Sequence, residues 1–191
     1  SYDKFKARLM FPIHNHKGAV VAFGGRRSNE EADSQYAKYL NSVASTIYDK
    51  SSVLYGLYQS KKEIARTGTA ILTEGYTDVI AMHVAGCENT VASCGTALTD
   101  NHAALLKKYA QEVILLRDGD SAGQRATVKD IDILLSHGLR VSVCTLPEGE
   151  DPDSFARNLD GDMGEWVSET KRDAIYWKVD GYDLIRDRYE T

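Results

Sequence analysis

The chain has 191 residues, a formal net charge of −5 and an ordinary hydrophobic fraction of 42%. These values fit a soluble globular protein with one large or two small domains. No run of about 18 apolar residues occurs, and the first ten residues are too polar for a signal peptide, so neither a membrane span nor a secretory leader is predicted. Because the chain starts without Met in a polar segment, we interpret it as a piece of a longer protein.

Charge is distributed unevenly along the chain. Residues 1–62 contain ten Lys and Arg against five Asp and Glu, whereas residues 63–191 contain thirteen against twenty-three. A basic half can hold phosphate groups, and an acidic half can hold divalent metals. Charge alone leaves a second interpretation open, namely an uneven but solvated protein surface.

The three cysteines, Cys87, Cys94 and Cys144, form no CxxC pair. The sequence therefore predicts no zinc site built from them, and favours three small core residues. An odd number of scattered cysteines fits the reducing cytoplasm.

The first third of the chain predicts a small β unit followed by a helix. Two short apolar runs, 8–13 and 19–24, are separated by a polar turn and predict a hairpin. Gly24-Gly25 is expected to force a turn or bulge. Residues 28–50 lack a clear period and are expected to be mostly irregular, and residues 51–66 have helical spacing of apolar positions.

From residue 69 the pattern alternates between strands and helices. Apolar runs that end in small or acidic residues are each followed by a helical segment, one with Thr99 or Asp100 as candidate N-cap and another closed by Gly138. This order predicts an α/β fold with a mostly parallel four-stranded sheet flanked by helices, within a chain that is α+β overall. The polar segment 154–191 is expected to be helical.

Acidic residues follow three of the four expected strands. Because ligands of open parallel sheets bind beyond the carboxyl ends of the strands, these acids are expected to share one edge. Clustered carboxylates repel each other unless a cation neutralises them, and hard oxygens suit Mg²⁺ or Mn²⁺. Capping of the next helix is the alternative for a single acid such as Asp120. The expected metal ligands are Glu74, Asp118, Asp120, Asp151 and Asp153.

Glycines at the same strand ends, Gly75, Gly95 and Gly119, would let a phosphate-bearing ligand approach the backbone. No Walker motif and no GxGxxG fingerprint occurs, which argues against a P-loop or Rossmann nucleotide site. The acids indicate metal-assisted phosphoryl or nucleotidyl transfer, or phosphodiester cleavage. The pattern alone does not separate these reactions.

Two motifs, TEGYTDV (73–79) and DGDSAG (118–123), resemble the TOPRIM domain that bacterial primases, topoisomerases and some nucleases share. Further segments resemble the RNA polymerase domain of the bacterial DNA primase family: RLMFPI (8–13), FGGR (23–26), KYLNS (38–42), LYGLY (54–58), ASCGTALT (92–99) and GEDPDS (149–154). The resemblance implies part of a basic N-terminal subdomain at 1–66, a TOPRIM metal-binding domain at 67–154 and the start of a helical subdomain at 155–191.

The resemblance also implies roles for single residues. Glu74, Asp118 and Asp120 would be catalytic and would bind two or more Mg²⁺ or Mn²⁺ ions together with Asp151 and Asp153. The residues expected to contact nucleotide or template are Arg26, Lys38, Asn41, Lys50 and Asp78. Arg117 departs from the family pattern, which often has an aromatic or apolar residue there. Lys38 and Lys50 could equally be solvated surface charges.

The activity implied is DNA-dependent synthesis of short RNA primers on single-stranded DNA, from nucleoside triphosphates, at the bacterial replication fork. The replicative helicase would be a partner through a domain that this chain lacks, as it lacks the family's zinc-binding domain; no membrane partner is expected. Two alternatives stay open. One is a TOPRIM nuclease or topoisomerase fragment, and the other is a TOPRIM scaffold that binds DNA without chemistry.

Overall fold

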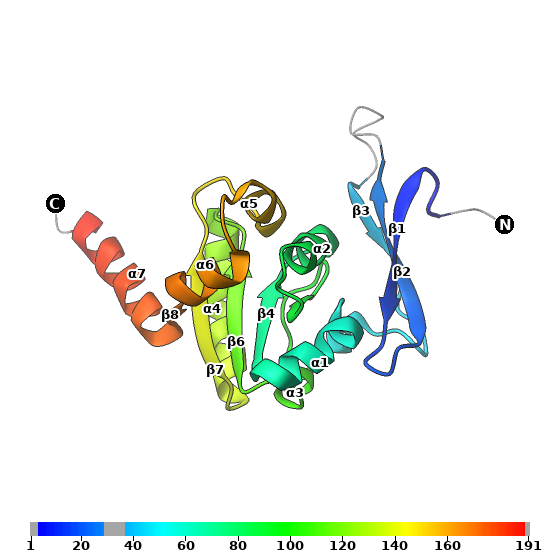
Figure 1. Cartoon of the computed structure of the whole chain (residues 1–191), viewed down its shortest axis with the longest axis horizontal. Coiled ribbons are helices and arrows are strands. Elements are labelled where there is room, and N and C mark those ends of the chain that lie inside the picture. The colour runs from blue at the N-terminus through cyan, green and yellow to red at the C-terminus, as the bar shows by residue number, and fades with distance from the viewer. Residues whose placement is uncertain (1–3, 29–36, 190–191) are drawn as a thin grey trace.

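The computed structural model describes the backbone of residues 4–28 and 37–189 and the side chains of residues 4–28 and 37–181. The described part contains two separate β-sheets, which helices accompany. A three-stranded sheet has the order β1-β2-β3, and a five-stranded sheet has the order β5-β4-β6-β7-β8. Figure 1 shows the small sheet at one end of the molecule and the last helix, α7, projecting from the other end.

The small sheet is antiparallel and consists of β1 (Arg8–His14), β2 (Val20–Arg27) and β3 (Tyr39–Asn41). The predicted hairpin is thus confirmed. The expected turn or bulge at Gly24-Gly25 is wrong, because both glycines lie inside β2 and pair in regular register with β1 and β3. The expectation of irregular structure is wrong for β3, which is too short to show a period. Residues 29–36 of that stretch lie outside the described part.

The larger sheet contains the four expected parallel strands, β4 (Thr69–Thr73), β5 (Thr90–Ala92), β6 (Glu112–Arg117) and β7 (Arg140–Thr145). Their apolar runs are buried on both faces, as is typical of parallel strands. The two-residue strand β8 (Arg172–Asp173) adds to β7 in antiparallel orientation. The predicted α/β sheet is confirmed, and β8 is too short to be read from the sequence.

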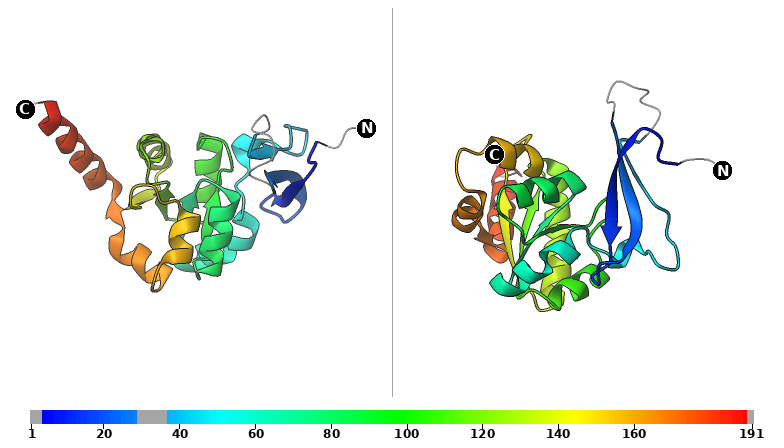
Figure 2. Two further views of the ribbon diagram at one scale, coloured as in Figure 1. Left: turned by 90° about the horizontal axis from the view of Figure 1, so that it is seen from above. Right: turned by 45° about the vertical axis from the view of Figure 1, so that its right-hand side comes forward.

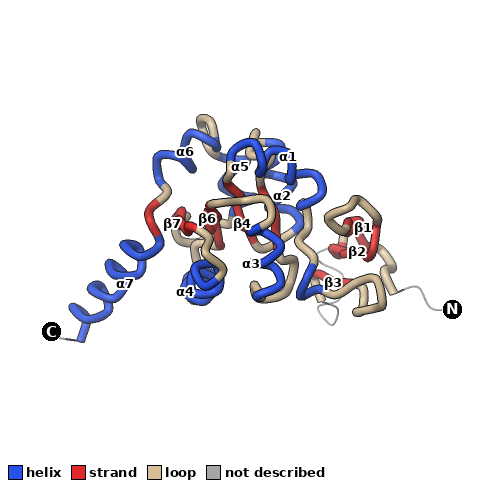
Figure 3. Tube along the Cα trace, turned by 90° about the horizontal axis from the view of Figure 1, so that it is seen from below, coloured by secondary structure: helices blue, strands red, loops and turns tan. Residues whose placement is uncertain are grey.

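Helices cover both faces of this sheet, as Figure 3 shows along the strands. One face carries α2 (Tyr76–Val84), α5 (Pro152–Asn158) and α6 (Met163–Thr170), and the other carries α3 (Asp100–Lys107) and α4 (Ser121–Ser136). Thr99 caps α3 through its hydroxyl, as expected. Helix α1 (Leu57–Thr67) packs against β5 and β4. It begins six residues later than expected, because Gly56 adopts a left-handed conformation with φ of 80°.

The strand side chains alternate between the two layers. Leu72 and Leu115 point into the cluster shared with α3 and α4, whereas Ile71 and Ile114 point into the cluster shared with α2 and α6. All three cysteines are buried free thiols, as predicted.

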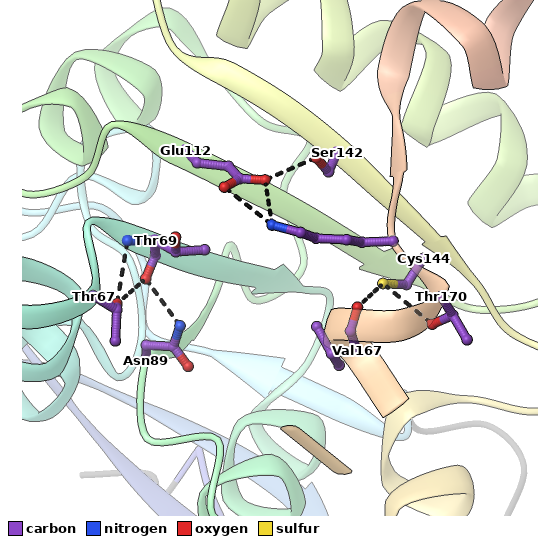
Figure 4. Close-up of polar contacts among 9 residues, drawn as sticks. Thr67, Thr69, Asn89, Glu112, Ser142, Cys144, Val167 and Thr170 are labelled. Atoms are coloured by element: carbon purple, nitrogen blue, oxygen red, sulfur yellow. Dashed lines mark hydrogen bonds and ion pairs between the residues drawn. The ribbon is translucent and has the colours of Figure 1, made fainter. Parts of the chain in front are cut away.

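The C-terminal helical segment starts with α5 and α6 and ends with α7 (Ala174–Tyr189), which Figure 2 shows leading away from the sheet. Polar contacts tie the junction of α6 and β8 to the strands (Figure 4). Glu112 accepts hydrogen bonds from Ser142 Oγ at 2.8 Å and from Lys171 Nζ at 3.0 Å. Among the described residues, no helix is long and apolar enough to cross a membrane.

The two sheets meet through an aromatic side chain, Tyr76, at the start of α2. Its ring stacks on Phe11 of β1 with centroids 4.8 Å apart, and meets Tyr55 edge-on at the same distance. Its hydroxyl donates a hydrogen bond to Asn41 Oδ1 at 2.7 Å, and Asn41 Nδ2 donates to the Cys94 carbonyl at 3.0 Å. This network fixes the small sheet against the carboxyl ends of β4 and β5.

Gly24 allows that contact. A methyl group at this position would lie 2.6 Å from Cε2 of Tyr76, whose ring is held by Phe11 and Asn41. We expect Gly24→Ala to lower the free energy of unfolding by about 1–3 kcal/mol, the usual cost of overpacking. Urea unfolding followed by circular dichroism would measure it.

The matched control is Gly181→Ala in α7, where a methyl group meets nothing within 4 Å. This change should be neutral or stabilising by up to about 1 kcal/mol, because alanine favours a helix. Equal stability of the Gly24 variant and the parent protein would show that the Tyr76 junction is loose.

Candidate metal and nucleotide site

The acids expected at the sheet edge come from three different strand ends. Glu74 follows β4, Asp118 follows β6, and Asp151 lies in the segment after β7. The three line one cavity of about 300 Å³. Since β4, β6 and β7 are adjacent and parallel, their carboxyl ends deliver these side chains to the same place.

The opposite wall of the cavity comes from the small sheet. Lys38, Tyr39 and Asn41, at and beside β3, face the acids across this space. The guanidinium of Arg26, on β2, lies over the Tyr39 ring at 5.9 Å from its centroid. The cavity therefore has an acidic wall and a wall that carries a cation, an aromatic ring and an amide. Such a pair of walls can hold a metal and a phosphate-bearing ligand together.

The turn that presents Glu74 is held by Asp78. The Asp78 carboxylate, which is only 6% exposed, accepts a hydrogen bond from the Gly75 backbone N–H at 2.7 Å. Asp78 thus stabilises the first turn of α2 and also lines the cavity.

Gly119 separates the two aspartates after β6. A methyl group there would lie 3.1 Å from the Leu146 carbonyl oxygen and 3.0 Å from the Pro147 carbonyl carbon. The Gly119 N–H donates a hydrogen bond to the Glu150 carbonyl at 2.9 Å. Gly119 therefore brings the loop after β6 close to the loop that carries Asp151.

Burial and mutual repulsion disturb the ionisation of the cluster. Burial, together with the nearby charges of Glu74, Asp78, Asp151 and Asp120, raises the pKa of Asp118 to about 7. Burial also raises the pKa of Asp78 to about 6, against the hydrogen bond from Gly75, which lowers it. The cluster thus carries negative charge that the protein does not fully neutralise, and this favours the binding of a cation.

Some acids also cap helices, as the alternative interpretation held. Asp120 accepts a hydrogen bond from Gly123 N–H at 2.7 Å at the start of α4, and Asp151 accepts one from Ser154 N–H at 2.6 Å at the start of α5. Asp153 pairs with Arg157 at 2.5 Å. Capping does not exclude metal binding, because a carboxylate has two oxygens and about four acceptor sites.

Several expected site residues lie outside the cavity wall. Asp120 and Asp153 are close enough for their charges to act on Asp118 and Asp78, respectively. Arg26 reaches the wall only through Tyr39. Lys50 lies in the short 3₁₀ helix Lys50–Ser52, where its carbonyl accepts a hydrogen bond from His102 Nε2 at 2.8 Å. The roles expected for these four residues stay predictions.

The donor set has the right chemistry for a hard divalent cation, since it consists of carboxylates without thiols or imidazoles. Within residues 4–28 and 37–189, however, no three His, Cys, Asp or Glu side chains are arranged to hold a single ion. The structure brings the carboxylates to one cavity without a closed coordination shell.

Sequence reasoning gave no role to Tyr39, Tyr76 and Cys94, which also line the cavity. Tyr39 and Tyr76 lie inside quoted motifs, KYLNS and TEGYTDV, next to residues that were singled out. Cys94 has a positive φ of 48°, which is uncommon for a residue other than glycine and leaves no signal in the sequence.

Family models match both parts of the chain. A model for the N-terminal domain of the DNA primase catalytic core matches residues 1–61, and a Toprim-like model matches residues 71–156. The chain belongs to the bacterial DNA primase family. The hairpin and basic segment are thus the part that resembles the N-terminal domain of the primase core, and the parallel sheet is the Toprim-like part.

Among curated relatives, the DNA primase of Halalkalibacterium halodurans is 45% identical over 154 residues, which is 81% of this chain and 25% of that protein. The DNA primase of Aquifex aeolicus is 41% identical over 188 residues, which is 93% of this chain and 37% of that protein. The chain therefore spans about a quarter to a third of the length of these relatives.

Solved primase structures have the same fold. A DNA primase domain from Pseudomonas aeruginosa matches with a TM-score of 0.87 and 34% identity, over 96% of this chain and 57% of that chain. The zinc-binding and RNA polymerase domains of the Aquifex aeolicus primase match with a TM-score of 0.83 and 40% identity, over 90% and 42% of the two chains. A primase catalytic domain bound to single-stranded DNA matches with a TM-score of 0.80, 36% identity, and coverage of 91% and 54%.

The raised pKa of Asp118 predicts a pH-dependent effect on stability. Its folded pKa of about 7 lies above the ordinary value of 3.8, so the folded state binds the proton more tightly. Ionised Asp118 therefore lowers the free energy of unfolding. This loss of stability is absent below about pH 4, grows as the pH rises toward 7, and is complete above about pH 7. Asp118→Asn should therefore raise the melting temperature of the metal-free protein more at pH 8 than at pH 5.

Thermal melts in EDTA at both pH values would measure this difference. The exposed Asp160, which lies outside the cluster, provides the control, and Asp160→Asn should shift the melting temperature equally at pH 5 and pH 8. A pH-independent effect of Asp118→Asn would mean that burial and the neighbouring carboxylates do not raise the pKa of Asp118 in the folded protein.

Proposed function

We propose that the protein of which this chain is part is a DNA primase, a DNA-dependent RNA polymerase that makes short RNA primers on single-stranded DNA. The observation that carries the proposal is the cavity between Lys38 and Tyr39 on one wall and Glu74, Asp118 and Asp151 on the other. Family membership adds support, since the relatives are DNA primases.

In this proposal, Glu74, Asp118, Asp120, Asp151 and Asp153 hold two or more Mg²⁺ or Mn²⁺ ions. The ions would lower the free energy of the negative charge that develops on the attacking and leaving oxygens. The protein's own contribution is to gather these carboxylates from strand ends that the sheet makes adjacent. No zinc is expected in this chain.

The substrates are two nucleoside triphosphates, or one triphosphate and a growing primer. The 3′-oxygen of one nucleotide forms a bond to the α-phosphorus of the other, the bond from that phosphorus to the bridging oxygen of pyrophosphate breaks, and the 3′-hydroxyl proton is lost. Glu74, which lines the cavity, would accept that proton. Lys38 on the facing wall would hold phosphate oxygens, and Asn41 and Asp78, which line the same cavity, would contact the nucleotide.

The template is single-stranded DNA, and the basic segment 1–62 is its binding surface, with Arg26 and Lys50 among the contacts. A related catalytic domain has been solved with single-stranded DNA bound. The replicative helicase would bind to a region outside this chain. The proposed divisions are residues 1–66 for the basic subdomain, 67–154 for the metal-binding domain and 155–191 for the start of a helical subdomain, in a bacterial cytoplasmic protein.

Calorimetric titration of ATP tests the metal site. We expect binding that requires Mn²⁺, and at least about tenfold weaker binding after Asp118→Asn/Asp120→Asn, since changes even to the groups that surround metal ligands lower metal affinity about 10–100-fold. Asparagine is a good N-cap, so α4 should keep its start in the variant. Equal affinity in both proteins would move the nucleotide site away from these aspartates.

Template binding can be tested by its dependence on salt. Binding of single-stranded DNA should weaken steeply as salt increases, because each phosphate contact releases about 0.7 counterions. Lys50→Ala should lower the slope of binding against salt by about the value of one phosphate contact. Lys108→Ala, which removes an exposed lysine after α3, should leave the slope unchanged. Binding that barely changes between low and moderate salt would refute the basic surface.

The TOPRIM nuclease or topoisomerase alternative has a separate outcome. A plasmid incubated with the protein and Mn²⁺ would be nicked by a nuclease and left intact by a primase, and a scaffold would bind DNA without either nicking or primer synthesis.

A further inference from the structure

A second cavity of about 500 Å³ adjoins the first. Glu74 and Gly95 line both, so the two spaces share part of their wall. The second cavity extends between the loop after β5 and one face of α4, and the metal and nucleotide proposal makes no use of it. We call this second space the α4 cavity.

The face of α4 in this cavity combines short and basic side chains. Ala122 and Ala126 lie one turn apart, and Arg125 and Lys129 lie one turn apart beside them, so that all four share one side of the helix. The alanines leave room above the helix. Arg125 and Lys129 are exposed and form a basic rim around that room.

A third cation, Arg117, belongs to the wall. It is only 6% exposed, donates a hydrogen bond to the Thr73 carbonyl at 3.2 Å, and pairs with Asp130 of α4. Its Nε is buried and has no hydrogen-bond partner within the described part of the chain.

The charges of the α4 cavity do not cancel. Asp130 is neutralised by Arg117, and Glu74 stands at the border with the acidic cluster. The positive charges of Arg125 and Lys129 remain at the rim. An arginine fork and a lysine ammonium one helical turn apart are suited to the oxygens of a phosphate group.

We propose that the α4 cavity binds a phosphate group next to the acidic edge. The inference rests on the proposed nucleotidyl transfer, which produces pyrophosphate and extends a strand with phosphates. Either of these could supply the group, as free pyrophosphate or as an internucleotide phosphate of a bound strand. A volume of about 500 Å³ lies within the range of sites that hold ligands of this size.

The test uses Arg125→Ala/Lys129→Ala, which removes the exposed rim and leaves the buried pair intact. Arg117 is kept, since its loss would leave Asp130 buried without a partner. The matched control, Lys108→Ala/Arg140→Ala, removes two exposed cations after α3 and at the start of β7, outside both cavities. The probes are pyrophosphate and an RNA tetranucleotide with a 5′-hydroxyl, titrated in EDTA and followed by amide chemical shifts.

We expect shifts in residues 95–98 and 122–129, with a dissociation constant about tenfold higher in the rim variant and unchanged in the control. Response to pyrophosphate alone identifies the free anion as the source, and response to the tetranucleotide alone identifies the strand. No shift with either probe, or equal weakening in the rim and control variants, overturns the proposal.

Asp118→Asn separates this inference from the function on which it rests. This variant should keep metal-free phosphate binding at the α4 cavity even as it loses Mn²⁺-dependent ATP binding. If the variant keeps both kinds of binding, only the proposed metal site is refuted. If it loses metal-free phosphate binding, the proposal that the α4 cavity binds phosphate independently of the metal site is refuted.

Discussion

Repulsion among the carboxylates at the edge of the parallel sheet is the constraint on which the site depends. The strand order places the ends of β4, β6 and β7 side by side, and each end brings an acid. Three helices, α2, α4 and α5, also start at this edge, so their positive N-termini offset part of the negative charge. The offset is incomplete, because burial together with the charges of the neighbouring acids still raises the pKa of Asp118 to about 7. A free-energy gain is therefore available to any cation that enters the cavity.

The cavity also depends on how the small sheet is fixed. Lys38 and Tyr39 face the acids only because β3 is anchored beside them, and the anchor is the hydrogen-bonded chain from Tyr76 through Asn41 to the Cys94 carbonyl. Tyr76 follows Glu74 by two residues, so one short segment supplies both an acid of the site and the aromatic contact that positions the opposite wall. The requirement for glycine at position 24 of β2 follows from the same contact. The sequence had predicted a turn or bulge at Gly24-Gly25 instead.

Features that depend on neighbouring residues in the chain were predicted from the sequence, and features that depend on contacts between distant segments were not. The parallel sheet, its helices and the edge where the acids gather were predicted, because strand periodicity, caps and motif order are local signals. Strands β3 and β8 were missed, since a strand of two or three residues is defined by its partner rather than by its own pattern. The pairing of Arg117 with Asp130, thirteen residues later, and the contact of Tyr76 with Asn41 join segments that no local pattern connects.

Capping and metal binding were set against each other as interpretations of the same acids, and the geometry makes them compatible. Asp120 and Asp151 each use one oxygen to cap a helix, which fixes the carboxylate at the sheet edge. Asp118 caps no helix in the described hydrogen-bond network. Its pKa of about 7 is higher than the pKa of about 6 of Asp78, so Asp118 is the acid that a bound cation would stabilise most. The two caps therefore hold Asp120 and Asp151 in position near Asp118. A substitution that preserves a cap, such as Asp120→Asn, isolates the charge of that residue from its structural role.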